Sequence, residues 1–208
     1  MKLLLCFLLA ACASIRAEAQ TPPPPAADAG TTSVETIVCV RHGEKPKGGL
    51  GQLNCKGLNR ALALPKVLLG KFGKPNFVFA PNPTEKSDGD NYFYVRPLVT
   101  IEPTAIRCGL PINTKFGFRD VAGLEQELQQ AQYHKATVFV AWEHALLDVF
   151  AKEMVKSLGG DSAQVPSWAS DDFDSIFLIK ITRAGQHQTI AFSVDHEGLN
   201  GQSDDCPD

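Results

Sequence analysis

The stretch Thr36-Ile37-Val38-Cys39-Val40-Arg41-His42-Gly43-Glu44 decides the fold of this chain. Its first part is an apolar, β-branched run without polar alternation, which is typical of a strand buried on both faces. The run stops at a cation, an imidazole and a glycine. Ligands of open α/β sheets bind outside the carboxyl ends of the strands, so Arg41 and His42 are candidates for such a site. A surface arginine followed by a loop histidine is the alternative at this point.

The bulk composition bounds the class of protein. A chain of 208 residues is long enough for one α/β domain with a substantial core. The formal net charge of -3 provides no basic face for nucleic acid, so we expect no nucleic-acid partner.

The first residues predict export. Lys2 precedes an apolar run, residues 3–11, that is too short to span a bilayer. Ala17-Glu18-Ala19 then supplies the small residues of an export cleavage site, which predicts a signal peptide at 1–19. We therefore expect a periplasmic or secreted protein without stable membrane insertion. Leu9-Ala10-Ala11-Cys12 resembles a lipoprotein box, and a lipid anchor at Cys12 is the alternative.

Residues 20–33 are rich in proline and small residues and predict a spacer without a core. The folded domain is expected at 34–208.

An exported chain makes its cysteines candidates for a disulfide. The four outside the signal peptide permit three pairings: Cys39, Cys55, Cys108 and Cys206. Cys39 lies in the predicted central strand, where a buried free thiol is expected. Cys206 lies in a polar tail and Cys55 in a loop-like region, so the favoured pair is Cys55 with Cys206.

The rest of the chain predicts strands that alternate with helices. Such alternation is typical of a mainly parallel sheet covered on both faces, a three-layer α/β/α sandwich. Further strands are expected at 77–80, 137–142, 175–182 and 188–194, and helices at 56–72, 96–108, 121–133 and 145–158. Asn54 or Cys55 is expected to cap the first helix. Pro65 and Pro103 are expected to bend or interrupt the helices that contain them.

Two of the predicted strands end in the same way, at Arg41-His42 and at Glu143-His144. In a parallel sheet both ends lie at one edge, so the two histidines can converge. Arg96, at the amino end of a helix, can join them. Arginines, imidazoles and a helix amino terminus in one crevice suit a tetrahedral phosphoryl group.

With these residues the sequence resembles the histidine phosphatase superfamily, which has the phosphoglycerate mutase-like fold. Arg41-His42-Gly43-Glu44 matches the family signature after its first strand. The stretch 53–61, Leu-Asn-Cys-Lys-Gly-Leu-Asn-Arg-Ala, is similar to the family's Leu-Thr-x-x-Gly-x-x-Gln-Ala helix start. Arg96 with Thr100 resembles the second arginine helix, and His144 resembles the second histidine.

The resemblance implies a role for each of these residues. His42 would be the nucleophile that becomes phosphohistidine, and the phosphoryl oxygens would be held by Arg41, Arg96 and His144. It implies no cofactor and no metal. The acidic run Asp171-Asp172-Phe173-Asp174 is interpreted as a solvated loop or helix cap in preference to a cation site.

The general acid is the least determined part of the predicted site. We favour Glu143, because its place at a strand end brings it near the crevice. Asp120 and Glu125, which follow the arginine helix, are the alternatives. Glu143 can also be read as a helix-start carboxylate favoured by the helix dipole.

The sequence therefore predicts an exported, metal-independent phosphatase that acts on a small phosphomonoester. The loop after Glu44 lacks the asparagine of sugar-phosphate mutases, and the excursion 81–95 carries Tyr92, Phe93 and Tyr94 toward a possible substrate pocket. Because of these departures, the sequence does not identify the substrate. A catalytically silent phosphate-binding protein of the envelope is the alternative from another class, and a phosphomutase is the enzymatic alternative.

Overall fold

The computed structural model describes residues 32–208 apart from residues 88 and 90. The predicted signal peptide at 1–19, Cys12 and most of the predicted spacer lie outside these residues. Six strands form one sheet in the order β5-β2-β6-β1-β7-β8. Their bounds are β1 (Ser33–Arg41), β2 (Phe77–Phe79), β5 (Ile112–Asn113), β6 (Thr137–Trp142), β7 (Ser175–Ala184) and β8 (His187–His196).

The predicted central strand lies in the middle of this sheet. β1 runs parallel to β6, in a register that pairs Arg41 with Trp142, and antiparallel to β7. β2 is parallel to both β5 and β6, whereas β7 and β8 form an antiparallel hairpin. The mainly parallel sheet expected from the sequence is confirmed, with the two last strands as its antiparallel part.

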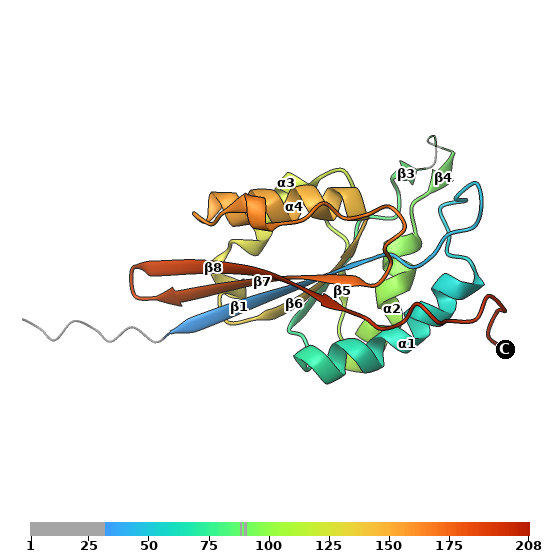
Figure 1. Ribbon diagram of the computed structural model, residues 1–208, viewed down its shortest axis with the longest axis horizontal. Helices are drawn as coiled ribbons and strands as arrows, with labels where there is room; N and C mark the ends of the chain where they lie inside the picture. The colour runs from blue at the N-terminus through green and yellow to red at the C-terminus, as the bar shows by residue number, and fades with distance from the viewer. Residues whose placement is uncertain (1–31, 88, 90) are drawn as a thin grey trace, which may run out of the picture.

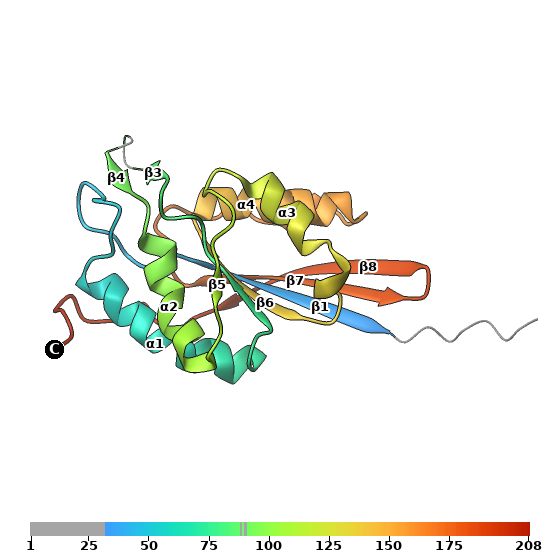
Figure 2. The same cartoon turned by 180° about the vertical axis from the view of Figure 1, so that it is seen from behind.

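Helices cover both faces of the sheet, as Figures 1 and 2 show from opposite sides. α1 (Cys55–Phe72) and α2 (Arg96–Cys108) lie on one face, and α3 (Val121–Leu128) and α4 (His144–Ser157) lie on the other. The three-layer α/β/α sandwich predicted from the sequence is thus confirmed.

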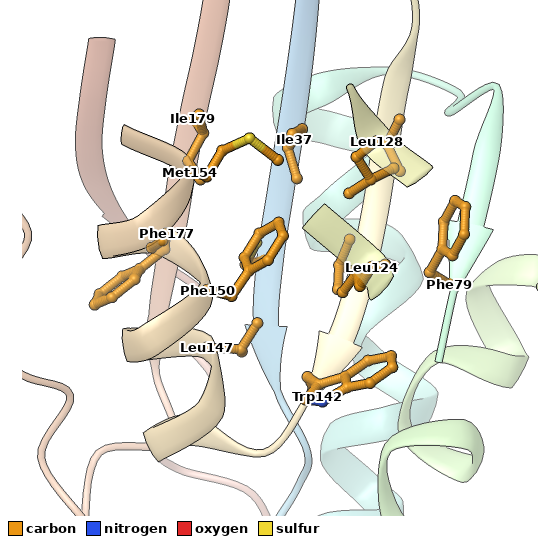
Figure 3. Packing of buried hydrophobic residues seen from close by; sticks show 14 of the residues in the cluster. Ile37, Phe79, Leu124, Leu128, Trp142, Leu147, Phe150, Met154, Phe177 and Ile179 are labelled. Atoms are coloured by element: carbon orange, nitrogen blue, oxygen red, sulfur yellow. The ribbon is translucent and has the colours of Figure 1, made fainter. Parts of the chain in front are cut away.

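The apolar run in β1 belongs to two cores. Ile37 and Cys39 pack with the α3 and α4 side chains, and Val38 and Val40 pack with those of α1 and α2. All four side chains have no exposed surface. In Figure 3, Phe150 and Met154 of α4 reach toward β1 and β7. Burial on both faces explains why the run carries no polar alternation.

Side-chain and glycine caps fix the helix ends around the site. Asn54 is the cap of α1: its Oδ1 accepts a hydrogen bond of 2.8 Å from the Gly57 N–H. Gly109 ends α2 in the left-handed conformation with φ 62°. Both helices run through Pro65 and Pro103 without interruption, so of the expected bend or interruption the second does not occur.

The predicted helix 121–133 is wrong in its second half. α3 ends at Leu128, and a separate 3-10 helix follows at Ala131–Tyr133. Gln130 between them is extended, with ψ 150°. The Tyr133 hydroxyl donates to Glu127 Oε1 at 2.9 Å, and its ring lies 4.8 Å from that of Phe77. These contacts draw the chain back onto the sheet before a continuous helix can form.

Three very short strands were not predicted. β3 (Lys86–Ser87) and β4 (Tyr92–Phe93) form a small separate sheet within the excursion 81–95, and β5 lies at the edge of the main sheet. Segments of two residues carry no periodicity that could reveal them.

The disulfide between Cys55 and Cys206 confirms the favoured pairing, with a Cα–Cα distance of 4.4 Å. It ties the C-terminal tail to the first residue of α1, beside which the tail runs in Figure 1. Asn59 Nδ2 adds hydrogen bonds to the carbonyl oxygens of Ser203 and Asp205. Cys39 and Cys108 are buried free thiols. Among the described helices, none has the length and apolar character needed to cross a membrane.

Candidate active site

The ends of β1 and β6 bring the predicted residues to one edge of the sheet. Arg41 is paired with Trp142, and the His42 N–H donates to the Trp142 carbonyl oxygen at 3.0 Å. Glu143 and His144 follow Trp142 directly and begin α4. The convergence expected from the two strand endings is therefore present.

Arg96 is brought to the same edge by a hydrogen-bonded threonine. Thr100 Oγ1 accepts from the Gly43 N–H at 2.9 Å and donates to the Arg96 carbonyl oxygen at 2.8 Å. One turn of α2 is thereby attached to the backbone beside His42. The Arg96 guanidinium lies 4.6 Å from the centre of the Tyr94 ring and is almost fully buried.

The loop that carries His42 packs closely against α1. A Cβ atom at Gly43 would lie 2.8 Å from the Gly57 carbonyl oxygen, and one at Gly57 would lie 2.3 Å from the Glu44 carbonyl oxygen. Side chains at these two positions would push the loop away from the helix. Both glycines of the sequence motifs are thus required for the position of His42.

The surroundings of His42 favour a neutral imidazole. It is only 2% exposed, and its Nδ1 lies 2.7 Å from the Gly43 carbonyl oxygen. Burial lowers the pKa of His42 to about 3. The charges of Arg96 and Arg41 also lower this pKa, whereas the hydrogen bond to Gly43 raises it. Since a carbonyl oxygen only accepts, Nδ1 carries the proton and Nε2 keeps its lone pair.

Arg41 is held by neutral groups. Its Nη1 donates to the carbonyl oxygens of Ser170 and Asp172, both at 2.8 Å. Its guanidinium carbon lies 3.8 Å from the centre of the Phe173 ring. Burial lowers the pKa of Arg41, although nearby acidic groups oppose this. Because its direct acceptors carry no charge, the cation keeps an attraction for an oxyanion.

The loop before β7 is therefore a part of the site that sequence reasoning missed. The acidic run was interpreted as solvated, and its contact with Arg41 is made by backbone carbonyls and by Phe173. Its carboxylates serve the loop itself: Asp172 Oδ1 accepts from the N–H groups of Asp174 and Ser175. Within the part of the chain that the structure describes, no group of three or more His, Cys, Asp or Glu side chains is arranged to hold a metal ion.

Glu143 caps α4 and holds His144. Its Oε2 accepts from the Leu146 N–H at 3.0 Å, and its Oε1 lies 2.5 Å from His144 Nδ1. Burial alone would raise the pKa of Glu143, but His144 and the N–H groups of the first helical turn lower it to about 2. A carboxyl group that is ionised at neutral pH has no proton to give. The geometry thus favours an orienting role for Glu143, and its role as general acid stays a prediction.

The two alternative donors lie in different surroundings. Asp120 is exposed and caps α3 by accepting from the Gly123 N–H at 2.9 Å. Glu125 accepts from the hydroxyl of Ser157 at 2.7 Å, at the far end of α4 from His144. Because α4 has 14 residues, that end lies about 20 Å from the site along the helix axis. Glu125 is therefore not placed to protonate a leaving group.

Fold and site together define an α/β protein with a candidate anion site at the carboxyl edge of its sheet. A neutral imidazole and two buried guanidinium groups gather there, beside the start of α4. Such a set is suited to a phosphoryl group.

The comparisons with solved structures agree with this class. The SixA protein of Nakamurella multipartitia, a candidate phosphohistidine phosphatase, matches with a TM-score of 0.52 at 16% identity, over 79% of this chain and 96% of that one. A mycobacterial glucosyl-3-phosphoglycerate phosphatase matches with a TM-score of 0.50 at 15% identity, over 78% and 97%. The chain has the phosphoglycerate mutase-like fold of the histidine phosphatase superfamily. No family model and no curated protein matches the sequence.

Proposed function

We propose that this chain is an exported phosphatase that hydrolyses a small phosphomonoester through a phosphohistidine on His42. The observation that carries the proposal is the neutral His42 imidazole, whose Nδ1 donates to the Gly43 carbonyl and whose Nε2 lone pair lies among buried guanidinium groups. Phosphatases among the structural neighbours support the reaction class.

In the first step the Nε2 lone pair attacks phosphorus. The N–P bond forms as the bond from phosphorus to the ester oxygen breaks, and the leaving alcohol takes up a proton. Arg41 and Arg96 bind the phosphoryl oxygens and stabilise the charge that they carry in the transition state. The imidazole becomes positively charged once phosphorylated, and the Gly43 carbonyl oxygen at Nδ1 stabilises this charge.

In the second step water attacks the phosphoryl group. The N–P bond breaks, inorganic phosphate leaves, and the electron pair returns to Nε2 of the neutral imidazole. The contact of Glu143 Oε1 with His144 Nδ1 fixes the orientation of the second imidazole, and an N–H at its Nε2 would donate to a phosphoryl oxygen. The two arginines supply the positive charge that a metal ion provides in other phosphatases, so the reaction proceeds without a metal.

Export is the second part of the proposal. It rests on the signal-peptide pattern at 1–19, and the Cys55–Cys206 disulfide is consistent with an oxidising compartment. The protein would be periplasmic or secreted, or held to the envelope by a lipid on Cys12.

The deciding experiment measures p-nitrophenyl phosphate hydrolysis by the purified protein, with and without EDTA. We expect turnover that EDTA leaves unchanged and that His42→Ala abolishes. The control is His187→Ala, which removes an exposed imidazole from β8.

Rapid base-quench with intact-protein mass spectrometry should show one added phosphoryl group on the wild type and none on His42→Ala. Normal turnover by His42→Ala would exclude the covalent mechanism. Absence of turnover by the wild type on any phosphomonoester, with retained phosphate binding, would leave the silent binding protein as the function.

A further inference from the structure

Arg60 of α1 is a buried cation that no step of the proposed reaction uses. It has no exposed surface. Its Nε and Nη2 donate to the two carboxylate oxygens of Glu44, at 2.9 and 2.8 Å. Its Nη1 donates to Glu197 Oε2 at 2.6 Å, and Nη2 also donates to Asn200 Oδ1 at 3.0 Å. One guanidinium group therefore connects α1, the loop after β1 and the segment after β8.

The Glu44 contact acts directly on the group that orients His42. The Gly43 carbonyl, which accepts from His42 Nδ1, belongs to the planar peptide unit that includes the Glu44 N–H. Rotation of Glu44 would thus turn this carbonyl away from the imidazole. The two-bond contact with Arg60 restricts that rotation, together with the hydrogen bond from the Asn54 N–H to the Glu44 carbonyl oxygen at 2.9 Å.

The Glu197 contact extends the same connection to Arg41. The Glu197 N–H donates to the Asp174 carbonyl oxygen at 2.7 Å, and Asp174 Oδ1 accepts from the Leu199 N–H at 2.9 Å. Asp174 also lies 3.8 Å from Arg60 Nη1. It belongs to the loop before β7 whose carbonyls at 170 and 172 hold Arg41. Arg60 is therefore linked to both residues of the Arg41-His42 pair.

We propose that Arg60 is a positioning residue of the reaction: through Glu44 it fixes the carbonyl that holds His42 in its reactive tautomer, and through Glu197 it supports the loop that holds Arg41. This inference rests on the proposed function. It goes beyond a structural ion pair, because it predicts that loss of Arg60 disturbs a named atom of the site in a protein that remains folded.

A second arginine that pairs with a buried carboxylate provides the control. Arg183 Nη1 lies 2.9 Å from Glu35 Oε2, and the Glu35 side chain has no exposed surface. This pair lies in β1 and β7 at the end of the sheet away from His42. Arg183→Met and Arg60→Met both remove a guanidinium from a buried carboxylate. Only Arg60→Met should affect the site.

The test combines kinetics on p-nitrophenyl phosphate with the nitrogen chemical shifts of the His42 ring, both at a temperature where circular dichroism shows the folded state. We expect Arg60→Met to lower kcat by about 100-fold, the cost of a small misplacement of reacting groups. We expect the shifts to change from a ring protonated at Nδ1 to a mixture of tautomers. Arg60→Lys should recover part of the loss, because lysine keeps the charge without the two-pronged contact.

Glu44→Gln provides a second variant with little change in volume, and it should show the same change in tautomer. Arg183→Met should leave both kcat per folded molecule and the His42 shifts unchanged. The proposal is overturned if Arg60→Met and Glu44→Gln leave the His42 tautomer as in the wild type, or if Arg183→Met lowers kcat equally. A wild-type protein without turnover would refute the proposed function alone, since the tautomer measurement needs no substrate.

Discussion

At the amino end of the sheet a partly exposed guanidinium lies beside a buried carboxylate, whereas at the carboxyl end a buried guanidinium lies among neutral carbonyl oxygens. Arg183 is 2.9 Å from Glu35 at the first end, and Arg41 donates to Ser170 and Asp172 backbone oxygens at the second. Both cations come from strands of one sheet. Their surroundings differ in whether an opposite charge is already in contact.

We interpret this difference as the one between a structural cation, Arg183, and a proposed binding cation, Arg41. Arg183 has its partner within the protein, and burial nevertheless raises the pKa of Glu35 to about 7 against the effect of Arg183. Arg41 has hydrogen bonds that fix its direction without neutralising it. Under the proposed function, a phosphoryl group would be the first negative charge in direct contact with this guanidinium. A buried arginine held only by carbonyls is a better indicator of an anion site than a buried arginine as such.

Removal of the two cations should give opposite results. We expect Arg41→Met to lower turnover by about 100- to 1,000-fold, the loss typical of one transition-state hydrogen-bond donor, with little change in the free energy of unfolding. Arg183→Met should lower the free energy of unfolding by about 1–3 kcal/mol, because Glu35 loses its partner, with unchanged turnover. Phosphatase assays and urea titrations of both variants check this. Equal loss of activity in the two variants would remove the distinction.

Two arginines of α2 allow the same comparison within one helix. Arg96 begins α2 and is buried, whereas Arg107 lies in its last turn and is exposed. Arg96→Ala should weaken transition-state binding by about 2–5 kcal/mol, the cost of truncating a buried charge-pair partner. Arg107→Ala should leave kcat/KM as in the wild type. If Arg107→Ala were the damaging change, the assignment of the second arginine would be wrong.

The role of Glu143 can be measured with two leaving groups. If Glu143 orients His144, Glu143→Gln should slow alkyl phosphate and p-nitrophenyl phosphate by the same factor, about 10- to 100-fold by analogy with other orienting carboxylates. If Glu143 is the general acid, the alkyl phosphate should suffer far more, since p-nitrophenolate leaves without a proton. Asp120→Asn provides the control on both substrates. A selective loss with Asp120→Asn would place the donor before α3.

The last prediction is that the His42 ring does not titrate near neutral pH. Because burial lowers the pKa of His42 from 6.5 to about 3, its ring shifts should not change between about pH 5 and 8, whereas an ordinary histidine titrates there. The unfolded chain binds this proton below pH 6.5 and the folded chain does not. The contribution of His42 to stability therefore decreases as the pH falls from 6.5 toward 3. A His42 midpoint near 6.5 would contradict the neutral nucleophile.

Much of the fold could be predicted because it depends on long apolar runs. β1 and β6 are such runs, and the cap at Asn54 and the stop at Gly109 follow from side-chain chemistry. The 3-10 helix at Ala131–Tyr133 could not be predicted, since the packing of Tyr133 against Phe77, which is distant in sequence, overrides local helix preference. β5 has only two residues, and it is a strand only through its parallel pairing with β2.

The site could be predicted only where it depends on strand ends and on a helix start. His42, His144 and Arg96 have sequence positions that imply a shared edge. The acceptors of Arg41 are backbone carbonyls, which every residue has, and they lie far from Arg41 along the chain. The pKa of Glu143 depends on which atoms its two oxygens contact. Adjacency in sequence suggested a proton donor, whereas the contacts of its two oxygens favour an orienting role, and the assignment of Glu143 as general acid stays a prediction.

The Cys55–Cys206 bond turns most of the domain into a covalent ring. Every strand of the main sheet except β1 lies inside this ring, as do all four α-helices. β1, which carries Arg41 and ends at His42, is the one main-sheet strand outside it, yet it sits between β6 and β7. If the disulfide forms before the chain folds, β1 must then insert between β6 and β7, which both belong to the ring. The segment that carries Arg41 and His42 is therefore the last strand needed to complete the sheet.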